Sequence, residues 1–256
     1  MKINKHRFSL KHLFKCTTVA IDFFKAQKNN LILFASIEWD DDDIVAHCMV
    51  FFIAGFVSSA TAKCFMAHEL AANPDIQDKL YEEIKTVHDE LNGGELTYEI
   101  IQKMKYMDMV LSETFRRWST GTAMDRICNK PYVLEKSDGT RVQLNVGDTI
   151  WIPARAIQMD PKYYPNPTKF DPERFNDDNK HEIQSGTFFP FGIGPRSCIG
   201  SRFALMQIKT LMYYLLLDYR IETCSKTETD LKVISKTIFT LDVKNGFYVK
   251  LITRNR

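Results

Sequence analysis

A cysteine in a glycine-rich stretch is the residue of this sequence best suited to bind a metal. Cys198 lies within residues 188–200, which read FFPFGIGPRSCIG and precede an apolar segment expected to form a helix. The positive end of a helix dipole and the nearby cation of Arg196 both favour a thiolate, the form in which cysteine binds metals. Gly194 and Gly200 permit a tight turn and the close approach of a flat ligand to the backbone. We therefore predict that Cys198 is a metal ligand.

Two further charged motifs could support this loop. Glu113 and Arg116 are three residues apart on an expected helix and so share one face, a pattern that alone is usually a solvated ion pair. Residues 172–175, which read PERF, lie in an irregular region and alone indicate a turn. One hypothesis explains both motifs, because buried charges need mutual pairing. A buried network of Glu113, Arg116 and Arg174 would hold a long loop against a core helix and deliver Cys198 to its metal.

Composition limits the possible classes of protein. The chain has 256 residues, of which 45% are apolar and 26% charged, as in globular domains. Its net charge of +2 argues against a nucleic-acid-binding protein, which needs many cations to neutralise phosphates. Residues 1–28 carry seven Lys or Arg and one acid, a weak indication of a mitochondrial transit segment, but Asp22 and the lack of Arg and Ser enrichment count against it. We expect no nucleic-acid partner.

The other cysteines and the apolar runs predict no further site. The six cysteines include no CxxC pair and no histidine at metal-binding spacing, so neither a zinc ribbon nor a disulfide framework is indicated, and a reducing compartment is expected. The longest apolar run, residues 48–57, is shorter than the roughly 18 residues of a membrane-spanning helix, so no transmembrane segment is expected. Buried, inert thiols are expected at Cys16, Cys48, Cys64, Cys128 and Cys224.

The first half of the chain is expected to be helical. Acids at residues 40–43 begin an apolar segment that extends to about Ala72, and a helix apolar on nearly all sides is normally buried. Asn73 and Pro74 predict the start of a second helix, which the glycines at 93 and 94 end. Two further helices are expected, from Thr97 to about Met104 and from about Tyr106 to Arg117.

The second half is expected to contain short strands and turns. Eight of the nine prolines lie between Pro131 and Pro195. Residues 160–196 are too rich in proline and polar residues for regular structure, and a loop of this length inside a domain is usually functional. Strands are expected at residues 132–134, 141–144 and 149–152.

A helix and a hairpin are expected at the C-terminal end. Residues 199–217 predict an apolar helix with Phe203, Ile208, Leu211 and Leu215 on its buried face. The Asn-Gly pair at 245–246 predicts a primed-turn hairpin that pairs residues 239–243 with residues 247–251.

Taken together, these motifs resemble those of the cytochrome P-450 family. FGIGPRSCIG is similar to the haem-binding signature of the family, Glu113 and Arg116 to its K-helix pair, and residues 172–175 to its PERF segment. Residues 125–128 resemble the strand after the K helix, whose arginine pairs with a haem propionate. The resemblance covers the chain from about Asp41 onward, and its details look most like insect microsomal, family 9-like enzymes. The signature matches are Phe191, Gly194, Arg196, Cys198 and Gly200.

The resemblance implies a fold and a cofactor. The fold would be mainly α with small β sheets (α+β), with residues 1–40 unassigned, residues 41–256 forming the C-terminal part of a cytochrome P-450 domain, and the fold incomplete at its N-terminus. The cofactor would be haem b, iron protoporphyrin IX. The Cys198 thiolate would be the axial iron ligand, Phe191 would shield the sulfur, and Arg196 and Arg126 would neutralise the propionates.

The resemblance also implies an activity. It is that of a haem-thiolate monooxygenase that inserts one atom of O2 into a small apolar substrate of xenobiotic, lipid or hormone type. NADPH would supply electrons through NADPH cytochrome P-450 reductase, with cytochrome b5 as a second partner, at the cytoplasmic face of the endoplasmic reticulum membrane. Membrane association would come from the family's N-terminal half. An acidic reductase could dock on Lys180, Arg202 and Lys209, which could equally be ordinary solvated charges.

Residues 41–72 resemble the family's I helix, with departures. Ala54 and Gly55 keep the room that the family leaves for oxygen, whereas Val57 replaces an acid and Ser58 only partly replaces a threonine hydroxyl. We expect slow or uncoupled turnover, because a positioned acid typically contributes about 10²- to 10⁴-fold. Gln158 replaces a histidine found in many relatives, with no consequence assigned.

The resemblance further implies a substrate pocket and leaves an alternative open. The pocket would include Phe51, Phe52, Phe56, residues 119–124 and residues 238–240. For the phenylalanines, packing in a buried core is an equal alternative. The alternative function is a catalytically impaired or non-catalytic, truncated haem-binding fragment that binds haem poorly and aggregates.

Overall fold

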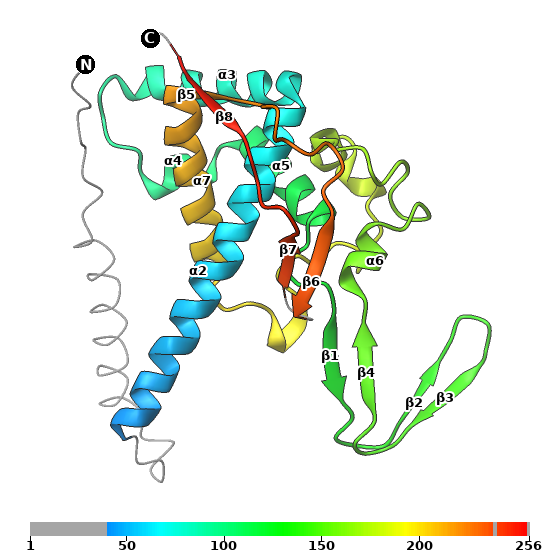
Figure 1. Cartoon of the computed structure of the whole chain (residues 1–256). Coiled ribbons are helices and arrows are strands. Elements are labelled where there is room, and N and C mark those ends of the chain that lie inside the picture. The colour runs from blue at the N-terminus through cyan, green and yellow to red at the C-terminus, as the bar shows by residue number, and fades with distance from the viewer. Residues whose placement is uncertain (1–39, 238–239, 255–256) are drawn as a thin grey trace. The chain divides into compact units, whose positions relative to one another are not determined.

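A computed structural model describes residues 40–237 and 240–254 (Figure 1). The chain divides into two compact units after Val57. Helices and two-stranded antiparallel sheets confirm the expected class, mainly α with small β sheets. The helices are α2 (Asp41–Ala72), α3 (Pro74–Leu91), α4 (Tyr98–Gln102), α5 (Lys105–Arg117), α6 (Ala154–Gln158) and α7 (Ser201–Asp218). The strands are β1 (Met124–Ile127), β2 (Tyr132–Glu135), β3 (Arg141–Leu144), β4 (Thr149–Ile152), β5 (Tyr219–Glu222), β6 (Val233–Thr237), β7 (Thr240–Val243) and β8 (Lys250–Thr253).

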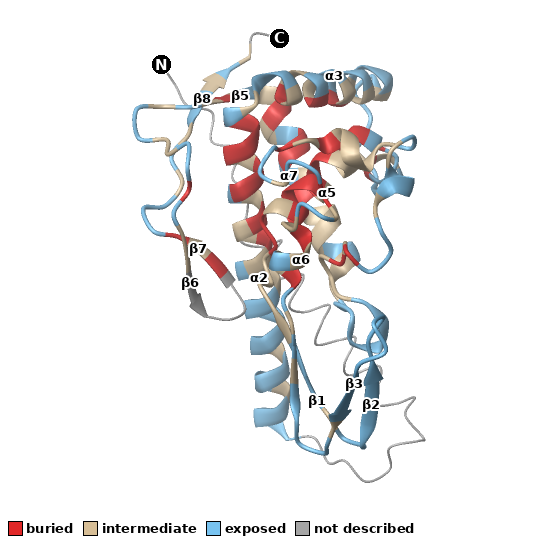
Figure 2. Cartoon of the chain, turned by 90° about the vertical axis from the view of Figure 1, so that its right-hand side faces the viewer, coloured by how far each residue is buried: buried red, intermediate tan, exposed pale blue. Residues whose placement is uncertain are grey.

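Helix α2 begins at aspartates and ends at Ala72, as predicted. The prediction that the whole helix is buried is wrong. The large apolar side chains of residues 45–57 are exposed, Phe56 by 61%, and buried residues begin only at Ser59 (Figure 2). Apolar composition predicts that a helix avoids water, but it does not specify which surface covers the helix.

The criterion behind the expectation of no transmembrane segment overlooked α2. By length and composition this helix could cross a membrane, with a mean hydropathy of 1.9 over an 18-residue window. His47 and the pair Ser58–Ser59 bound the apolar run of residues 48–57 yet lower the mean hydropathy of a longer window little, so counting uninterrupted apolar residues missed this helix. The core helix of a soluble protein can meet the same criterion.

Helices α3, α4 and α5 have nearly the predicted bounds. Pro74 occupies the first turn of α3, and Asn92 ends the helix in the left-handed conformation with φ 42°. Helix α3 also supports the start of α5. The Glu83 carboxylate accepts hydrogen bonds from the backbone N–H groups of Tyr106 at 2.8 Å and Met107 at 2.9 Å. These bonds satisfy two of the donors that have no partner inside a helix.

The main core joins the buried end of α2 to α3, α5 and α7, where Figure 2 shows the buried residues gathered. Burial of large apolar side chains supplies most of the stability of such a core, about 1.5–3 kcal/mol for each fully buried residue. Its fully buried members include Met66, Leu80, Ile84, Met107, Leu111 and Leu216.

The predicted buried face of α7 is partly wrong. Ile208 is buried, but Phe203 is 48% exposed and Leu211 is 44% exposed, while Leu215 is half-buried. The helix has apolar residues on more than one side, so its periodicity left the orientation open, and packing against α3 and α4 decided it. The buried residues of α7 are Ile208, Lys209, Met212, Tyr213, Leu216 and Leu217.

The predicted C-terminal hairpin is wrong in its pairing. The turn after Val243 forms, with Gly246 N–H donating to the Val243 carbonyl at 3.1 Å. Strand β7, however, pairs with β6, and β8 pairs with β5. Local turn chemistry predicts where a chain reverses, but partner strands elsewhere compete for its backbone groups. The predicted partner residue Phe239 lies outside the described residues.

The remaining strands position the region between α5 and α6. Strands β1 and β4 pair antiparallel, and the hairpin of β2 and β3 extends from them (Figure 1). The predicted strands at residues 132–134, 141–144 and 149–152 are confirmed, whereas the short helix α6 was not expected. Within residues 160–196 the structure has only turns and three short 3-10 segments, in agreement with the predicted irregular region. These segments are η1 (Pro172–Phe175), η2 (Lys180–Glu182) and η3 (Gly194–Arg196).

Candidate functional site

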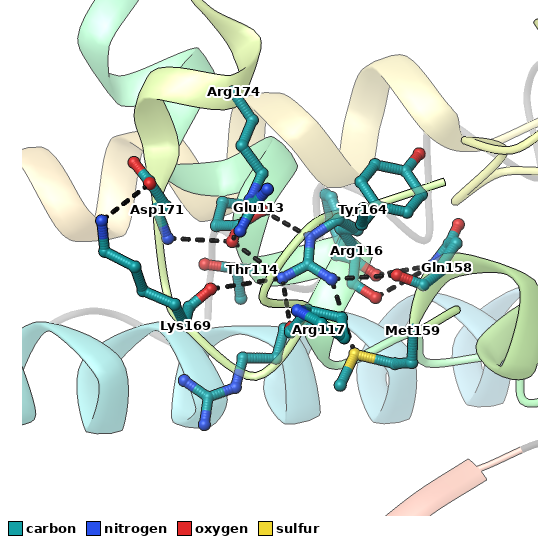
Figure 3. Close-up of polar contacts among 12 residues, drawn as sticks. Glu113, Thr114, Arg116, Arg117, Gln158, Met159, Tyr164, Lys169, Asp171 and Arg174 are labelled. Carbon is teal, nitrogen blue, oxygen red and sulfur yellow. Dashed lines mark hydrogen bonds and ion pairs between the residues drawn. The ribbon is translucent and has the colours of Figure 1, made fainter. Parts of the chain in front are cut away.

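Glu113 and Arg116 form a fully buried ion pair on α5 (Figure 3). Arg116 Nε donates to Glu113 Oε2 at 2.7 Å, and Arg116 Nη2 donates to Glu113 Oε1 at 2.8 Å. Both side chains have no exposed surface. A two-pronged contact of this kind is among the stronger charge-assisted interactions. The spacing of three residues on a helix makes it possible, because it places both side chains on one face.

The same pair holds the irregular region that follows α6. Arg116 Nη1 donates to the Gln158 carbonyl at 2.9 Å, and Nη2 donates to the Pro167 carbonyl at 2.8 Å. Glu113 Oε1 accepts a hydrogen bond from the backbone N–H of Asp171 at 2.9 Å. The buried charges therefore find backbone partners in the loop, and the loop is fixed to α5.

Arg174 joins this pair from η1. Its Nε lies 3.6 Å from Glu113 Oε1, an ionic contact too long for a hydrogen bond, and its Nη2 donates to the Asn166 carbonyl at 3.0 Å. The structure thus brings Glu113, Arg116 and Arg174 together, as Figure 3 shows. The network anchors the segment between α6 and η1 against the core helix.

A second buried charge was not anticipated from the sequence. Glu69 of α2 is 2% exposed and accepts hydrogen bonds from Trp118 Nε1 at 2.5 Å and Arg117 Nη1 at 3.0 Å. Burial raises the pKa of the Glu69 carboxyl, while Arg117 and the Trp118 hydrogen bond act in the opposite direction. The available signal was an acid inside an apolar helix, because such a residue must find a buried partner.

Cys198 lies on an exposed, turn-rich loop. Its backbone N–H donates to the Phe191 carbonyl at 2.7 Å, and Ser197 N–H donates to the Gly194 carbonyl at 3.0 Å. Gly192 and Gly194 have φ of 75° and 80°, which side chains other than glycine rarely adopt. The thiol is free and exposed. These turns present Cys198 two residues before Gly200, which is the N-cap of α7.

The surroundings of the thiol fit a cysteine-ligated haem. Every residue from 193 to 199 is exposed, and the apolar side chains of Ile193 and Ile199 are 62% and 87% exposed. Within the described part of the chain, neither Arg126 nor Arg196 forms an ion pair with a carboxylate, and both are exposed. On the loop itself, a free thiol, the exposed cation of Arg196 and uncovered apolar side chains match an iron ligand, a propionate partner and a flat apolar ring.

The other signature residues have distinct settings. The Phe191 ring packs edge-on against Phe115 of α5, with centroids 5.2 Å apart. Gly200 has an ordinary φ of −92°, so the predicted need for glycine's backbone freedom applies to Gly194 but not to Gly200. A Cβ at either position would meet no atom within 4 Å.

The I-helix residues lie on either side of the division after Val57. Ala54 is exposed and Gly55 is half-buried in the first unit, and Ser58 is half-buried in the second. The alternative that Phe51, Phe52 and Phe56 pack in a buried core is wrong, because they are 47%, 52% and 61% exposed. Ser119 is buried, residues 120–124 are half-buried, and residues 238–239 lie outside the described residues.

Two minor predictions need correction. The expected buried thiols are not fully buried: Cys64 is exposed, while Cys48, Cys128 and Cys224 are half-buried, and Cys16 lies outside the described residues. Lys209 is also not a surface cation. Its side chain is 1% exposed, and Nζ pairs with Asp108 Oδ1 at 2.6 Å.

Comparisons with known proteins give the family. The sequence model described as Cytochrome P450 matches residues 1–249. "Probable cytochrome P450 9f2" of Drosophila melanogaster is 52% identical over 85% of this chain and 42% of its own length. "Cytochrome P450 9e2" of Blattella germanica is 48% identical over 85% of this chain and 40% of its own length. "Cytochrome P450 6B1" of Papilio polyxenes is 40% identical over 86% of this chain and 43% of its own length.

The extent of these matches limits what they establish. The chain spans about two fifths of the length of these curated relatives. The matching family model nevertheless covers nearly the whole chain, and the members of that family bind haem b. The haem-signature loop, the buried Glu-Arg pair and the family match agree. The chain belongs to the cytochrome P450 family.

Proposed function

We propose that this chain supplies the haem-ligand part of a haem-thiolate monooxygenase. The observation that carries the proposal is the exposed Cys198 thiol, two residues from the exposed Arg196, on a loop that packs against α5. A purely structural cysteine would more often be a buried, inert thiol.

The loop residues and Arg126 of β1 have proposed roles. Cys198 Sγ would bind the haem iron, Arg126 and Arg196 would neutralise the haem propionates, and Phe191 would shield the sulfur. Gly194 and Gly200 let the ring approach the backbone. When bound, cysteine-ligated haem b supplies the oxygen chemistry, whereas the protein positions the substrate and protons.

The proposed roles on α2 rest on its resemblance to the family's I helix. Ala54 and Gly55 would keep room for oxygen, and Ser58 would partly replace a threonine hydroxyl. Val57 offers no proton at the position where the family signature has an acid. This residue favours the second candidate function, a catalytically impaired haem-binding protein with slow or uncoupled turnover.

The proposed substrate is small and apolar, of xenobiotic, lipid or hormone type, and O2 is the second substrate. Electrons come from NADPH through NADPH cytochrome P-450 reductase, with cytochrome b5 as a further partner. The proposed location is the cytoplasmic face of the endoplasmic reticulum membrane. Family membership and the similarity to insect family 9 proteins support these assignments.

The ferrous–CO difference spectrum tests haem-thiolate ligation. We expect the chain alone to bind haem poorly, because its apolar α2 and loop residues are exposed. The chain complemented by the N-terminal part of the Drosophila relative should give a thiolate-type Soret band, and Cys198→Ser should abolish it. If the complemented chain lacks this band while the complete relative has it, the proposal is wrong.

The ratio of product formed to NADPH consumed tests the choice between the two candidate functions. In the complemented protein, Val57→Asp should increase the product formed per NADPH consumed. The exposed neighbour Val50, changed to Asp, is the matched control. An unchanged ratio in the Val57 variant would remove the reason for considering the enzyme impaired.

A further inference from the structure

The C-terminal end of α5 has its free carbonyls satisfied largely by α6. The last four carbonyls of a helix have no partner within it. Here Trp118 N–H donates to the Thr114 carbonyl at 2.8 Å, and Arg155 Nη1 donates to the Arg117 carbonyl at 2.5 Å. The two carbonyls between them, of residues 115 and 116, both accept from Gln158 Nε2, at 3.1 and 3.2 Å.

The other side of the same amide faces the cysteine loop. Gln158 Oε1 accepts a hydrogen bond from the backbone N–H of Phe189 at 3.3 Å, and Gln158 has no exposed surface. Phe189 is 7% exposed. A glutamine amide carries both donors and an acceptor, so one side chain can satisfy helix carbonyls and a loop N–H together. A carboxylate lacks the donors, and an aliphatic side chain lacks both.

Two backbone hydrogen bonds connect this contact to Cys198. The Phe189 carbonyl accepts from Gly192 N–H at 2.9 Å, and the Phe191 carbonyl accepts from Cys198 N–H at 2.7 Å. The first bond closes a short turn and the second closes residues 191–198 into a loop, so a shift at Phe189 moves the start of the loop that carries the thiol. The Phe191 ring against Phe115 is a second contact with α5, but it fixes no hydrogen-bond register.

We propose that Gln158 is a positioning residue that fixes the Cys198 loop in register with the end of the helix that carries Glu113 and Arg116. The part that concerns haem rests on the proposed function. Gln158 touches no reacting group, and it acts through the backbone of Phe189. Its loss should leave the loop attached by apolar contacts but free to shift its thiol.

A second buried glutamine offers a matched control. Gln77 of α3 also has no exposed surface, and its Nε2 donates to the carbonyls of Leu70 at 2.9 Å and Ile221 at 2.8 Å. Its Oε1 accepts from Ile221 N–H at 2.8 Å. The chemistry is the same, but Gln77 joins α2 to β5 rather than α5 to the cysteine loop.

The first measurement is amide hydrogen exchange in the full chain. Gln158→Met, which removes the donors and the acceptor at similar length, should speed exchange of the Phe189 amide about tenfold relative to the parent. Gln77→Met should speed exchange of the Ile221 amide and leave Phe189 unchanged. Exchange needs no haem, so it tests the register even if the proposed function fails.

The second measurement is the ferrous–CO spectrum of the complemented protein. Gln158→Met should lower the thiolate-type fraction of the Soret absorbance by at least half, whereas Gln77→Met should leave that fraction unchanged. Gln158→His, whose ring has one donor and one acceptor nitrogen, should restore part of the fraction.

Three outcomes would overturn the proposal. They are an unchanged Phe189 exchange rate in Gln158→Met, an unchanged thiolate fraction despite faster exchange, and an equal loss in the two Met variants. The last would mean that general destabilisation explains the effect. If the parent gives no thiolate band but Phe189 exchange responds as expected, the proposed function is wrong, while the role of Gln158 in fixing the Cys198 loop is supported.

Discussion

Arg116 and Arg196 occupy opposite settings in one chain. Arg116 is fully buried, and its guanidinium donates to a carboxylate and to loop carbonyls. Arg196 is exposed on the cysteine loop and, among the residues that the structure describes, forms no ion pair. The first charge is used entirely inside the fold, while the second faces outward.

The difference separates scaffold from site. A buried charge without a partner is costly, so removing either member of the Glu113–Arg116 pair should destabilise the fold. An exposed guanidinium is solvated by water, so its partner can be a ligand. The Glu113–Arg116 pair is therefore satisfied inside the fold, whereas the ligand loop keeps its thiol, the cation of Arg196 and its apolar side chains exposed.

The largest expected effect on stability is loss of the buried cation. Arg116→Met would leave Glu113 buried without its strongest partner and should lower the free energy of unfolding by about 3–5 kcal/mol. Urea denaturation measures the change. Arg196→Met is the control and should change it by less than about 0.5 kcal/mol. Equal midpoints for the two variants would contradict the distinction between scaffold and site.

The second buried acid should have an intermediate effect. Glu69→Ala removes the acceptor of the Trp118 indole N–H and the partner of Arg117, and should lower the free energy of unfolding by about 1–3 kcal/mol. Glu69→Gln keeps an acceptor and should cost less. Glu90→Ala, at an exposed position on α3, is the denaturation control. If Glu69→Ala is as stable as this control, the second network is not part of the scaffold.

The thiol itself should matter little for stability. Because Cys198 is exposed, Cys198→Ser should change the free energy of unfolding by less than about 0.5 kcal/mol while abolishing the thiolate-type CO band. Denaturation of the chain and the spectrum of the complemented protein measure the two effects separately. A large loss of stability would mean that Cys198 belongs to the scaffold.

The smallest effect concerns an exposed ion pair and depends on pH. Hydrogen bonds from Lys180 and Lys105 lower the pKa of Asp177 to about 2, from an ordinary value of 3.8. Since the pKa is depressed in the folded state, the stabilisation is present above 3.8 and is lost as pH falls through about 2.

Asp177→Asn tests this pH dependence. The gap in denaturation midpoint between parent and variant should be small at pH 6, narrow as pH falls toward 2, and shrink in high salt. A gap that widens on acidification would contradict the expectation that Asp177 stabilises the fold less at low pH.

The sequence alone determined the positions of the main elements and of the motifs. Apolar periodicity, Pro74 and the aspartates of α2 act through neighbouring residues, so the bounds of α2, α3 and α5 were predictable. The loop around Cys198 and the Glu113–Arg116 spacing were recognisable for the same reason, because residue type and local order define them.

Only the tertiary structure decided what each surface meets. It exposed much of α2, turned Leu211 of α7 outward, paired β7 with β6, and buried Lys209 beside Asp108. It also gave Gln158 its bridging position between α5 and Phe189. These outcomes depend on partners distant in the chain that compete for the same backbone groups and apolar faces, and local sequence does not encode that competition.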